Sequence, residues 1–255
     1  MARSAAARER KPLPPPLPPD RRTVGQLVAE TLRFYGSHFG RSLLLGVPPA
    51  LVTVVSAELD RTARFVFVLT AGAALFTIGY IGACALMATA RVERRALAVA
   101  FVAGFLVYLP VPFLAFGFVL PALAWLALVG LVVPVAVIEG LGFRGSFVRA
   151  TQLARADYIH ALGGLATLVI AYFLTRLMLF FLLQSAGEST ERVAAFLADL
   201  VLSPILFVGS VLLYYDQAAR AALGSGGRST RRRNADVRDA DQADDTGRPD
   251  AAFQS

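Results

Sequence analysis

Residues 96–138 read ALAVAFVAGFLVYLPVPFLAFGFVLPALAWLALVGLVVPVAVI, an apolar run without a charged side chain. A helix crosses the hydrocarbon core of a bilayer with about 20 apolar residues, so this run is too long for one crossing. Its middle is interrupted by Pro110, Pro112, Gly117 and Pro121. We expect two membrane helices at about 97–117 and 119–138, joined by a tight turn. A re-entrant pair is the alternative.

The composition of the whole chain also indicates a membrane protein. Hydrophobic residues make up 56% of the 255 residues and charged residues 17%, whereas soluble domains average about 45–50% apolar and about 25% charged. Backbone groups in lipid must bond to one another, which leaves helices and closed barrels as spanning structures. The apolar runs do not alternate with polar residues as barrel strands do. The predicted fold class is therefore all-α, a polytopic membrane helical bundle.

We place six transmembrane helices, at about 42–58, 65–89, 97–117, 119–138, 160–184 and 195–215. Cytoplasmic segments next to membrane helices carry an excess of Lys and Arg. If the amino terminus is cytoplasmic, most arginines outside the spans fall on the inside, and the outer loops contain Arg61, Arg64 and Arg192. We therefore expect a multi-pass protein of the cytoplasmic membrane with both termini in the cytoplasm.

The two ends of the chain differ in composition from the membrane domain of residues 23–222. Residues 1–22 contain the proline-rich stretch KPLPPPLPPDRR, and residues 223–255 are rich in Gly and Ser, then basic, then acidic. Proline interrupts helices and a polar tail cannot bury a core, so we expect disorder in both cytoplasmic segments. The formal net charge of +7 indicates attraction to membrane lipids with anionic headgroups, not to nucleic acid.

Residues 23–41, TVGQLVAETLRFYGSHFGR, predict an amphipathic helix on the cytoplasmic face of the membrane. Thr23 and Gln26 have the spacing of a capping box, in which each side chain bonds the backbone N–H of the other. An apolar stripe at helical spacing is formed by Val24, Leu27, Val28, Thr31, Tyr35 and Phe39. Such a helix lies in the headgroup plane or packs on the bundle, and the two arrangements are compatible.

A second amphipathic helix is predicted after Glu139, where an apolar run ends in the sequence VIEGLGFRGSFVRA. The glycines allow the chain to turn, and Ser146 is the expected N-cap of a helix at about 147–158. An unpaired carboxylate at this depth is costly. We therefore expect Glu139 to pair with Arg144 or Arg149 and to hold the turn. A chemical or transport role for Glu139 is the alternative.

The last predicted span ends in the sequence YYDQAAR. Tyr214 and Tyr215 suit the aromatic belt at the membrane interface. Asp216 and Arg220 are four residues apart, a spacing that pairs opposite charges on one helix face. Asp216 and Glu139 are expected at the same membrane face. Two carboxylates there suit cation or proton binding, but the surrounding arginines make ion pairing the simpler interpretation.

Arg176 is a charged residue inside the apolar stretch IAYFLTRLMLFFLL. A charge inside a membrane helix is by default a candidate functional site. Arg176 lies nearer the outer end of its span than the middle. Its side chain is therefore expected to extend to the outer surface, or to pair with Glu58, Glu188 or Glu191. Structural and functional interpretations of this residue are both open at this point.

The sequence contains no motif that indicates catalysis or metal binding. It has one cysteine and two histidines, no HExxH, no P-loop, and no GxGxxG that follows a predicted strand. We therefore expect no catalytic residues, no cofactor and no metal, and no feature identifies a protein partner. The leading hypothesis is a non-enzymatic scaffold or lipid-contacting module. The alternative is a small transporter that uses Arg176 and the membrane face with Glu139 and Asp216.

Three stretches, in this order and spacing, resemble a family of bacterial six-span membrane proteins of poorly defined function: TVGQLVAETLRFYGSHFGRSLLLG, VVPVAVIEGLGFRGSFVRATQLAR and LLYYDQAAR. The family is similar to the membrane domain that precedes the catalytic barrel in some glycerophosphodiester phosphodiesterases. The resemblance covers about residues 23–222. It is carried by Pro134, Glu139, Arg149, Tyr214, Tyr215, Asp216 and Arg220.

The chain departs from the pattern of this family at two positions. Ala150 stands where a serine is expected, and Gln217 stands where a leucine or a similar residue is common. The set of histidines and carboxylates that phosphodiesterase chemistry needs is absent. The resemblance therefore implies a six-helix membrane domain and does not imply phosphodiesterase activity.

Overall fold

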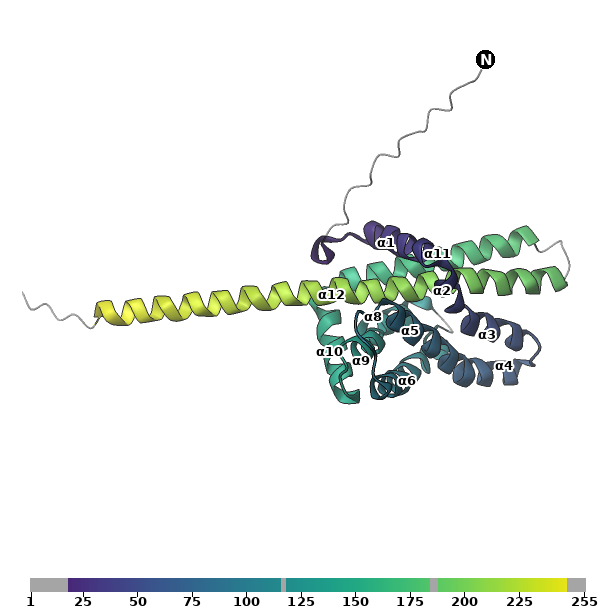
Figure 1. Ribbon diagram of the computed structural model, residues 1–255, viewed down its shortest axis with the longest axis horizontal. Helices are drawn as coiled ribbons and strands as arrows, with labels where there is room; N and C mark the ends of the chain where they lie inside the picture. The colour runs from purple at the N-terminus through teal and green to yellow at the C-terminus, as the bar shows by residue number, and fades with distance from the viewer. Residues whose placement is uncertain (1–17, 116–117, 184–187, 247–255) are drawn as a thin grey trace, which may run out of the picture.

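The protein is largely helical over residues 18–115, 118–183 and 188–246, which are the ranges that the computed structural model describes (Figure 1). No strand is present within these ranges, and six helical stretches are long and apolar enough to cross a membrane. They are Phe39–Ala57, Arg61–Met87, Arg94–Ala115, Val119–Ile138, Tyr158–Leu179 and Arg192–Leu223. The predicted all-α fold class is confirmed, and the chain is a multi-pass membrane protein.

Most of these stretches are built from more than one helix. The first comprises α2 (Phe39–Leu44) and α3 (Val47–Ala57), and the second α4 (Arg61–Phe67), the π-helical turn η2 (Val68–Gly72) and α5 (Ala73–Met87). The third comprises α6 (Arg94–Tyr108) and α7 (Val111–Ala115), and the fourth α8 (Val119–Val129) and α9 (Val132–Ile138). The fifth and sixth lie in α11 (Tyr158–Leu183) and α12 (Glu188–Thr246). The remaining elements are η1 (Pro19–Arg21), α1 (Val24–Ser37) and α10 (Phe143–Ala156).

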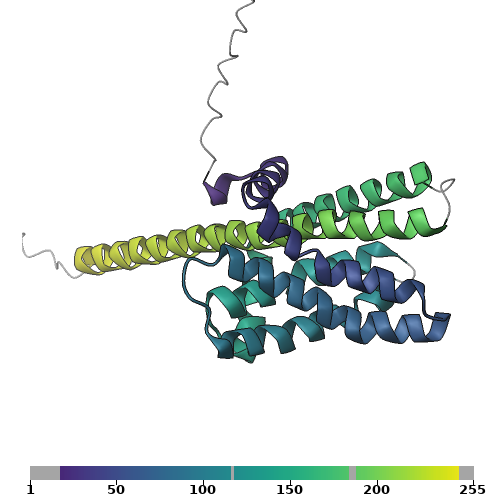
Figure 2. The ribbon, with the colours of Figure 1, turned by 45° about the vertical axis from the view of Figure 1, so that its right-hand side comes forward.

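α11 and α12 form a long antiparallel pair, and the other helices pack around it (Figures 1 and 2). α12 is in contact with α1, α3, α5 and α10 as well as with α11. α9 is buried along most of its length and packs on α5, α6 and α10. One end of the bundle carries η1, α1 and α10 and is called the termini face below. The opposite end, with the connection between α3 and α4, is called the distal face.

The apolar run of residues 96–138 folds into two separate helical stretches. α6 with α7, and α8 with α9, are each long and apolar enough to cross a membrane, as the predicted pair of full spans requires. Pro110 lies in the turn between α6 and α7, and Pro121 lies in the first turn of α8. Backbone N–H groups in a first turn have no helical acceptor, so these prolines divide the run without removing a helical hydrogen bond.

The capping box that begins α1 is confirmed. The backbone N–H of Thr23 donates to Oε1 of Gln26 at 2.8 Å, and the N–H of Gln26 donates to the Thr23 hydroxyl. The buried face of the helix consists of Leu27, Thr31 and Tyr35. This face packs on α11 and α12. Residues 23–41 are not one helix, because the chain changes direction at His38 before α2 begins.

The second amphipathic helix is present as α10, but it begins earlier than predicted. It starts at Phe143 with Gly142 as its N-cap, so the expected N-cap at Ser146 is wrong. Gly140 has φ +67°, a left-handed conformation that glycine adopts without strain, and this turn allows the early start. Ser146 is buried inside the helix, where its hydroxyl donates to the carbonyl oxygens of Leu141 and Gly142.

The folded domain begins before the boundary that composition predicts. Residues 1–17 of the predicted disordered leader 1–22 lie outside the described ranges. Arg22 is 8% exposed and forms an ion pair with a buried carboxylate of α12. It therefore belongs to the folded domain, because it supplies the opposite charge that a carboxylate needs in a low-dielectric interior.

α12 is longer than the predicted sixth span. Composition predicts disorder over residues 223–255, whereas α12 continues as a helix to Thr246, and residues 247–255 lie outside the described ranges. Proline removes a helical hydrogen bond, and the sequence contains none between Pro204 and Pro249. The polar stretch beyond the span thus has no residue that removes a helical hydrogen bond.

The packing of α12 against the first span depends on a proline and a glycine. Pro204 lies inside α12 and has no N–H, so the carbonyl oxygen of Leu200 loses its helical donor. Gly46 lies between α2 and α3, directly against this carbonyl group. A Cβ atom on Gly46 would come within 2.0 Å of the Leu200 oxygen. The two backbones therefore approach more closely than any residue with a side chain permits.

We predict that Gly46→Ala destabilises the protein, because the added methyl group meets backbone atoms. Overpacking of this kind costs about 1–3 kcal/mol, or more. Gly36→Ala in α1 is the matched control, since no neighbouring element lies within 4 Å of a Cβ atom there. Thermal unfolding in detergent should give a lower midpoint for Gly46→Ala and an unchanged or slightly higher one for Gly36→Ala. Equal midpoints would contradict the close approach at Gly46.

Candidate functional site

A cavity of about 410 Å³ lies among the second to sixth spans. Small-molecule sites typically have volumes of about 300–1,000 Å³. The wall is mostly apolar and includes Phe76, Leu123 and Phe207. Its polar side chains belong to Tyr80, Tyr108, Tyr172, Arg176, Ser203 and Ser210. This composition suits an apolar molecule that carries a polar group.

We infer that the cavity opens between α8 and α11, at the side of the bundle. Val119 of α8 and Phe173 of α11 line its wall, and they are also 47% and 54% exposed. α8 and α11 are in contact with each other. Both residues lie in membrane-spanning stretches. The side chains at the opening, a valine and a phenylalanine, are therefore apolar.

A buried polar cluster lies at the part of the cavity nearest the distal face. Asp199 of α12 is 1% exposed. Nη1 of Arg176 donates to its Oδ1 at 2.6 Å, and the hydroxyl of Tyr172 donates to the same oxygen at 2.5 Å. The hydroxyl of Thr53 donates to Oδ2, and Arg176 also donates to the Tyr172 hydroxyl at 3.0 Å. One carboxylate thus joins α3, α11 and α12.

The partner of Arg176 differs from those that the sequence suggested, which were Glu58, Glu188 and Glu191. Arg176 pairs with Asp199, while Glu58 pairs with Arg192. The other two glutamates have side chains outside the described part of the chain. Asp199 was missed, although a carboxylate inside the apolar stretch AAFLADLVLSPIL carries the same signal as Arg176. A cation and a carboxylate inside two consecutive apolar spans form the sequence pattern that predicts the Arg176–Asp199 pair.

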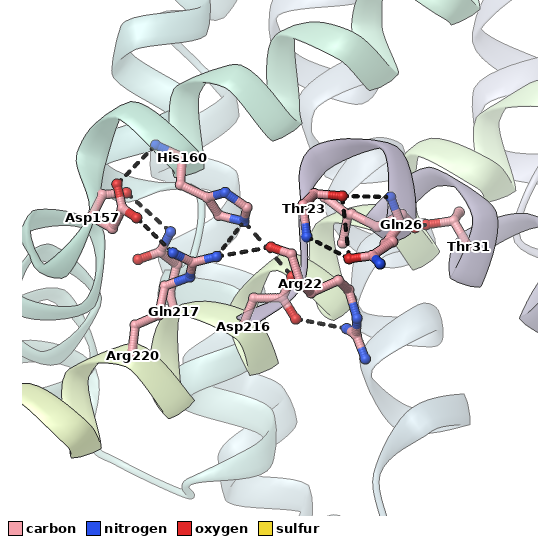
Figure 3. Close-up of polar contacts among 10 residues, drawn as sticks. Arg22, Thr23, Gln26, Thr31, Asp157, His160, Asp216, Gln217 and Arg220 are labelled. Carbon is pink, nitrogen blue, oxygen red and sulfur yellow. Dashed lines mark hydrogen bonds and ion pairs between the residues drawn. The ribbon is translucent and has the colours of Figure 1, made fainter. Parts of the chain in front are cut away.

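A second buried cluster lies at the termini face, around the fully buried Asp216 (Figure 3). Nη1 of Arg22 donates to its Oδ1 at 2.6 Å, and Nε2 of His160 lies 3.8 Å from its Oδ2. The predicted pair of Asp216 with Arg220 is wrong. Arg220 pairs with Asp157 at 2.8 Å and donates to the backbone carbonyl of Arg22. Asp157 lies between α10 and α11, where its carboxylate reaches Arg220 of α12, while Arg22 neutralises Asp216.

Glu139 forms an ion pair with Arg149, one of its two predicted partners. Nε of Arg149 lies 3.2 Å from Oε2 of Glu139, whereas Arg144 is exposed. The hydroxyl of Tyr214 donates to Oε1 of Glu139 at 2.9 Å. Tyr214 is buried beneath α10 and is not the interface aromatic that was expected. Tyr215 is half-buried and donates to a backbone carbonyl of α5 at 3.3 Å.

The polar candidates from the sequence therefore divide into two groups. The Glu139 and Asp216 clusters lie at the termini face and do not line the cavity, whereas Arg176 does. Within the ranges that the structure describes, no group of three or more His, Cys, Asp or Glu is placed to hold a metal ion. The cavity with its Arg176–Asp199 cluster is thus the candidate site.

No family model, curated protein or solved structure matches the chain. The resemblance to the membrane domain of some glycerophosphodiester phosphodiesterases stays a prediction.

We predict that Arg176→Met destabilises the protein more than the double variant Arg176→Met with Asp199→Leu does. The single change leaves a buried carboxylate without its counter-charge, and breaking a buried ion pair costs about 3–5 kcal/mol. The double change removes both charges and leaves apolar groups in an apolar environment. Thermal unfolding in detergent measures the difference.

Arg192→Met is the control for this comparison. It removes the exposed ion pair with Glu58, and exposed pairs contribute at most about 1 kcal/mol. Its unfolding midpoint should therefore stay close to that of the unmodified protein. If the double variant were less stable than Arg176→Met, Arg176 would not stabilise the protein by neutralising the charge of Asp199.

Proposed function

We propose that the protein is a non-enzymatic lipid-binding module of the cytoplasmic membrane, which takes one lipid-like molecule into the cavity among its spans. The observation that carries this proposal is the cavity, with a volume of about 410 Å³, an apolar wall and a polar cluster at one end. Ligand sites commonly have this composition, in which the apolar wall encloses the ligand and a few polar groups orient it.

The place of the cavity supports a ligand that comes from the bilayer. The cavity lies within membrane-spanning stretches, and apolar side chains stand at its opening. Lipid tails are as apolar as the wall, so moving a chain from the bilayer into the cavity gains little hydrophobic free energy. Selectivity then depends on the polar end. There, a ligand with hydrogen-bonding groups finds partners that the hydrocarbon core does not offer.

We further propose that the termini face is cytoplasmic. Arginines exposed in its described part include Arg33, Arg41, Arg91, Arg94, Arg95, Arg144 and Arg155. The described distal face has Arg61, Arg64 and Arg192. This excess supports the orientation with both termini inside. It also supports binding of anionic headgroups around α1 and α10, to which each basic residue near the surface contributes about 1 kcal/mol.

The alternative function is a small transporter that uses Arg176 together with Glu139 and Asp216. The geometry supports it less well, because Arg176 lies in the cavity while the two carboxylates lie at the termini face. There they are paired with Arg149 and Arg22. The cavity wall on the side away from Arg176 is mostly apolar. Binding of a membrane-dissolved molecule therefore accounts for more of the observed arrangement than a polar path across the membrane.

We predict that acyl chains cross-link to the cavity wall in native membranes. Cells fed a diazirine-bearing fatty acid incorporate it into every class of acyl lipid, so the experiment does not depend on the headgroup. After irradiation, peptides of α8 and α11 that line the cavity should carry the label. Val169→Phe places a ring in the cavity and should reduce these cross-links by about tenfold, because overpacking of about 1.4 kcal/mol has that effect.

Ile170→Phe is the matched control, since it introduces the same side chain one residue further along α11. Ile170 is 54% exposed and does not line the cavity, so the cross-links should persist. Cross-links that are equal in Val169→Phe and in the unmodified protein would overturn the proposal. So would labelling confined to lipid-facing residues such as Phe101 and Val102, which are exposed on α6.

We predict the orientation from single cysteines at exposed positions in a Cys84→Ala background. An impermeant maleimide added to intact cells should label Thr62→Cys and Thr190→Cys at the distal face. Glu93→Cys and Val148→Cys, at the termini face, should be labelled only after the cells are opened. Labelling of position 93 from outside would reverse the proposed orientation.

A further inference from the structure

We propose that the ligand of the cavity is an uncharged glycerolipid of the mono- or diacylglycerol class, held by hydrogen bonds from Arg176 and Ser203. This inference rests on the proposed function, because it names the lipid that the cavity takes. Three observations carry it. They are the net charge of the polar cluster, an unpartnered hydroxyl on the cavity wall, and the distance between the two.

The polar cluster at the distal end of the cavity is electrically neutral. Asp199 and Arg176 form an ion pair at 2.6 Å, and the other members, Tyr172 and Thr53, bear hydroxyl groups. A phosphate headgroup would add net negative charge to an apolar site. Burying a charge without a partner costs far more than burying a neutral group that forms hydrogen bonds. The cluster therefore favours an uncharged headgroup.

Arg176 retains hydrogen-bond donors for such a headgroup. A guanidinium group carries five N–H donors, and Arg176 bonds to the rest of the described chain through Nη1. The side chain lines the cavity and is 36% exposed. Asp199 holds the guanidinium group of Arg176 in place. Its Nε and Nη2 atoms therefore have fixed positions from which they donate to ester or hydroxyl oxygens of a ligand.

Ser203 provides the second contact. It lines the cavity and is 1% exposed, yet its hydroxyl has no hydrogen-bond partner within the described ranges. Ser210, on the same wall, satisfies its hydroxyl by donating to the carbonyl oxygen of Leu206. A buried hydroxyl without a partner destabilises a protein. A ligand oxygen that accepts a hydrogen bond from Ser203 removes this cost. The removed cost adds to the binding free energy of the ligand.

The two contacts are close enough for one headgroup. Asp199, which holds Arg176, is four residues before Ser203 in α12, so the two lie on one helix face about 6 Å apart along the axis. The glycerol group of a mono- or diacylglycerol carries both free hydroxyl and ester oxygens. An acyl chain attached to it continues along Leu206, Phe207 and Leu213, which form the next part of the wall.

The test compares two photoactivatable lipids that share the same diazirine-bearing acyl chains, a diacylglycerol and a phosphatidic acid. Each is added at the same low fraction to phosphatidylcholine liposomes that contain the full-length protein. Cross-linked peptides of the cavity wall are quantified against those of the lipid-facing surface of α6. The unmodified protein should give about tenfold more cavity cross-links with diacylglycerol, a difference equivalent to one strong hydrogen bond.

Two variants test the assigned contacts. Ser203→Ala should lower diacylglycerol cross-linking by about three- to tenfold, because one hydrogen bond to the ligand is lost. Asp199→Asn keeps hydrogen-bonding atoms beside Arg176 but removes the negative charge, which gives the cluster a net positive charge. This variant should therefore prefer phosphatidic acid. Ser203→Ala removes a single oxygen atom. It therefore still tests the assigned contact with diacylglycerol if Asp199→Asn does not fold.

The outcomes separate the headgroup from the cavity. Cavity cross-links to phosphatidic acid that equal those to diacylglycerol in the unmodified protein would overturn the headgroup proposal while supporting a lipid cavity. An unchanged preference in the folded variants would overturn the roles of Ser203 and Asp199. Cross-links from both lipids that spare the cavity wall would overturn the proposed function itself.

Discussion

Two carboxylates on α12 must be neutralised inside the bundle, and the arrangement of the other helices depends on this requirement. Asp199 and Asp216 are 1% and 0% exposed, and an unpaired charge in such an environment costs several kcal/mol. Asp199 pairs with Arg176 of α11 and accepts a hydrogen bond from Thr53 of α3. Asp216 pairs with Arg22, which lies before α1. The position of α12 therefore fixes three other elements.

The two ion pairs have the same chemistry but different surroundings. Arg22 and Asp216 are almost fully buried, and neither lines the cavity. Arg176 is partly open to a cavity, and the same pairing there creates a fixed guanidinium with donors to spare. Of these two ion pairs, the one with Arg176 is therefore the one that borders a cavity.

The sequence predicted the features that depend on local composition. Six apolar stretches were recognisable because membrane insertion averages hydrophobicity over about 20 residues. The Glu139–Arg149 pair was predictable because the two residues are 10 positions apart, on either side of the turn between α9 and α10. The pairs of Asp199 and Asp216 join residues 23 and 194 positions apart, and they depend on which helices become neighbours. The cavity likewise depends on how five spans pack together. The pattern of apolar residues along the sequence does not predict this packing.

The contact between Arg22 and Asp216 also implies an order of assembly. A chain enters the membrane from its amino terminus as it is synthesised, so Arg22 emerges early, whereas its partner lies in the last span. Arg176 also waits for α12, because Asp199 belongs to it. Until the sixth span arrives, Arg176 in the fifth span and Arg22 before α1 therefore both lack the carboxylates with which they pair in the folded protein. The sixth span therefore completes the charge balance of the bundle as well as its packing.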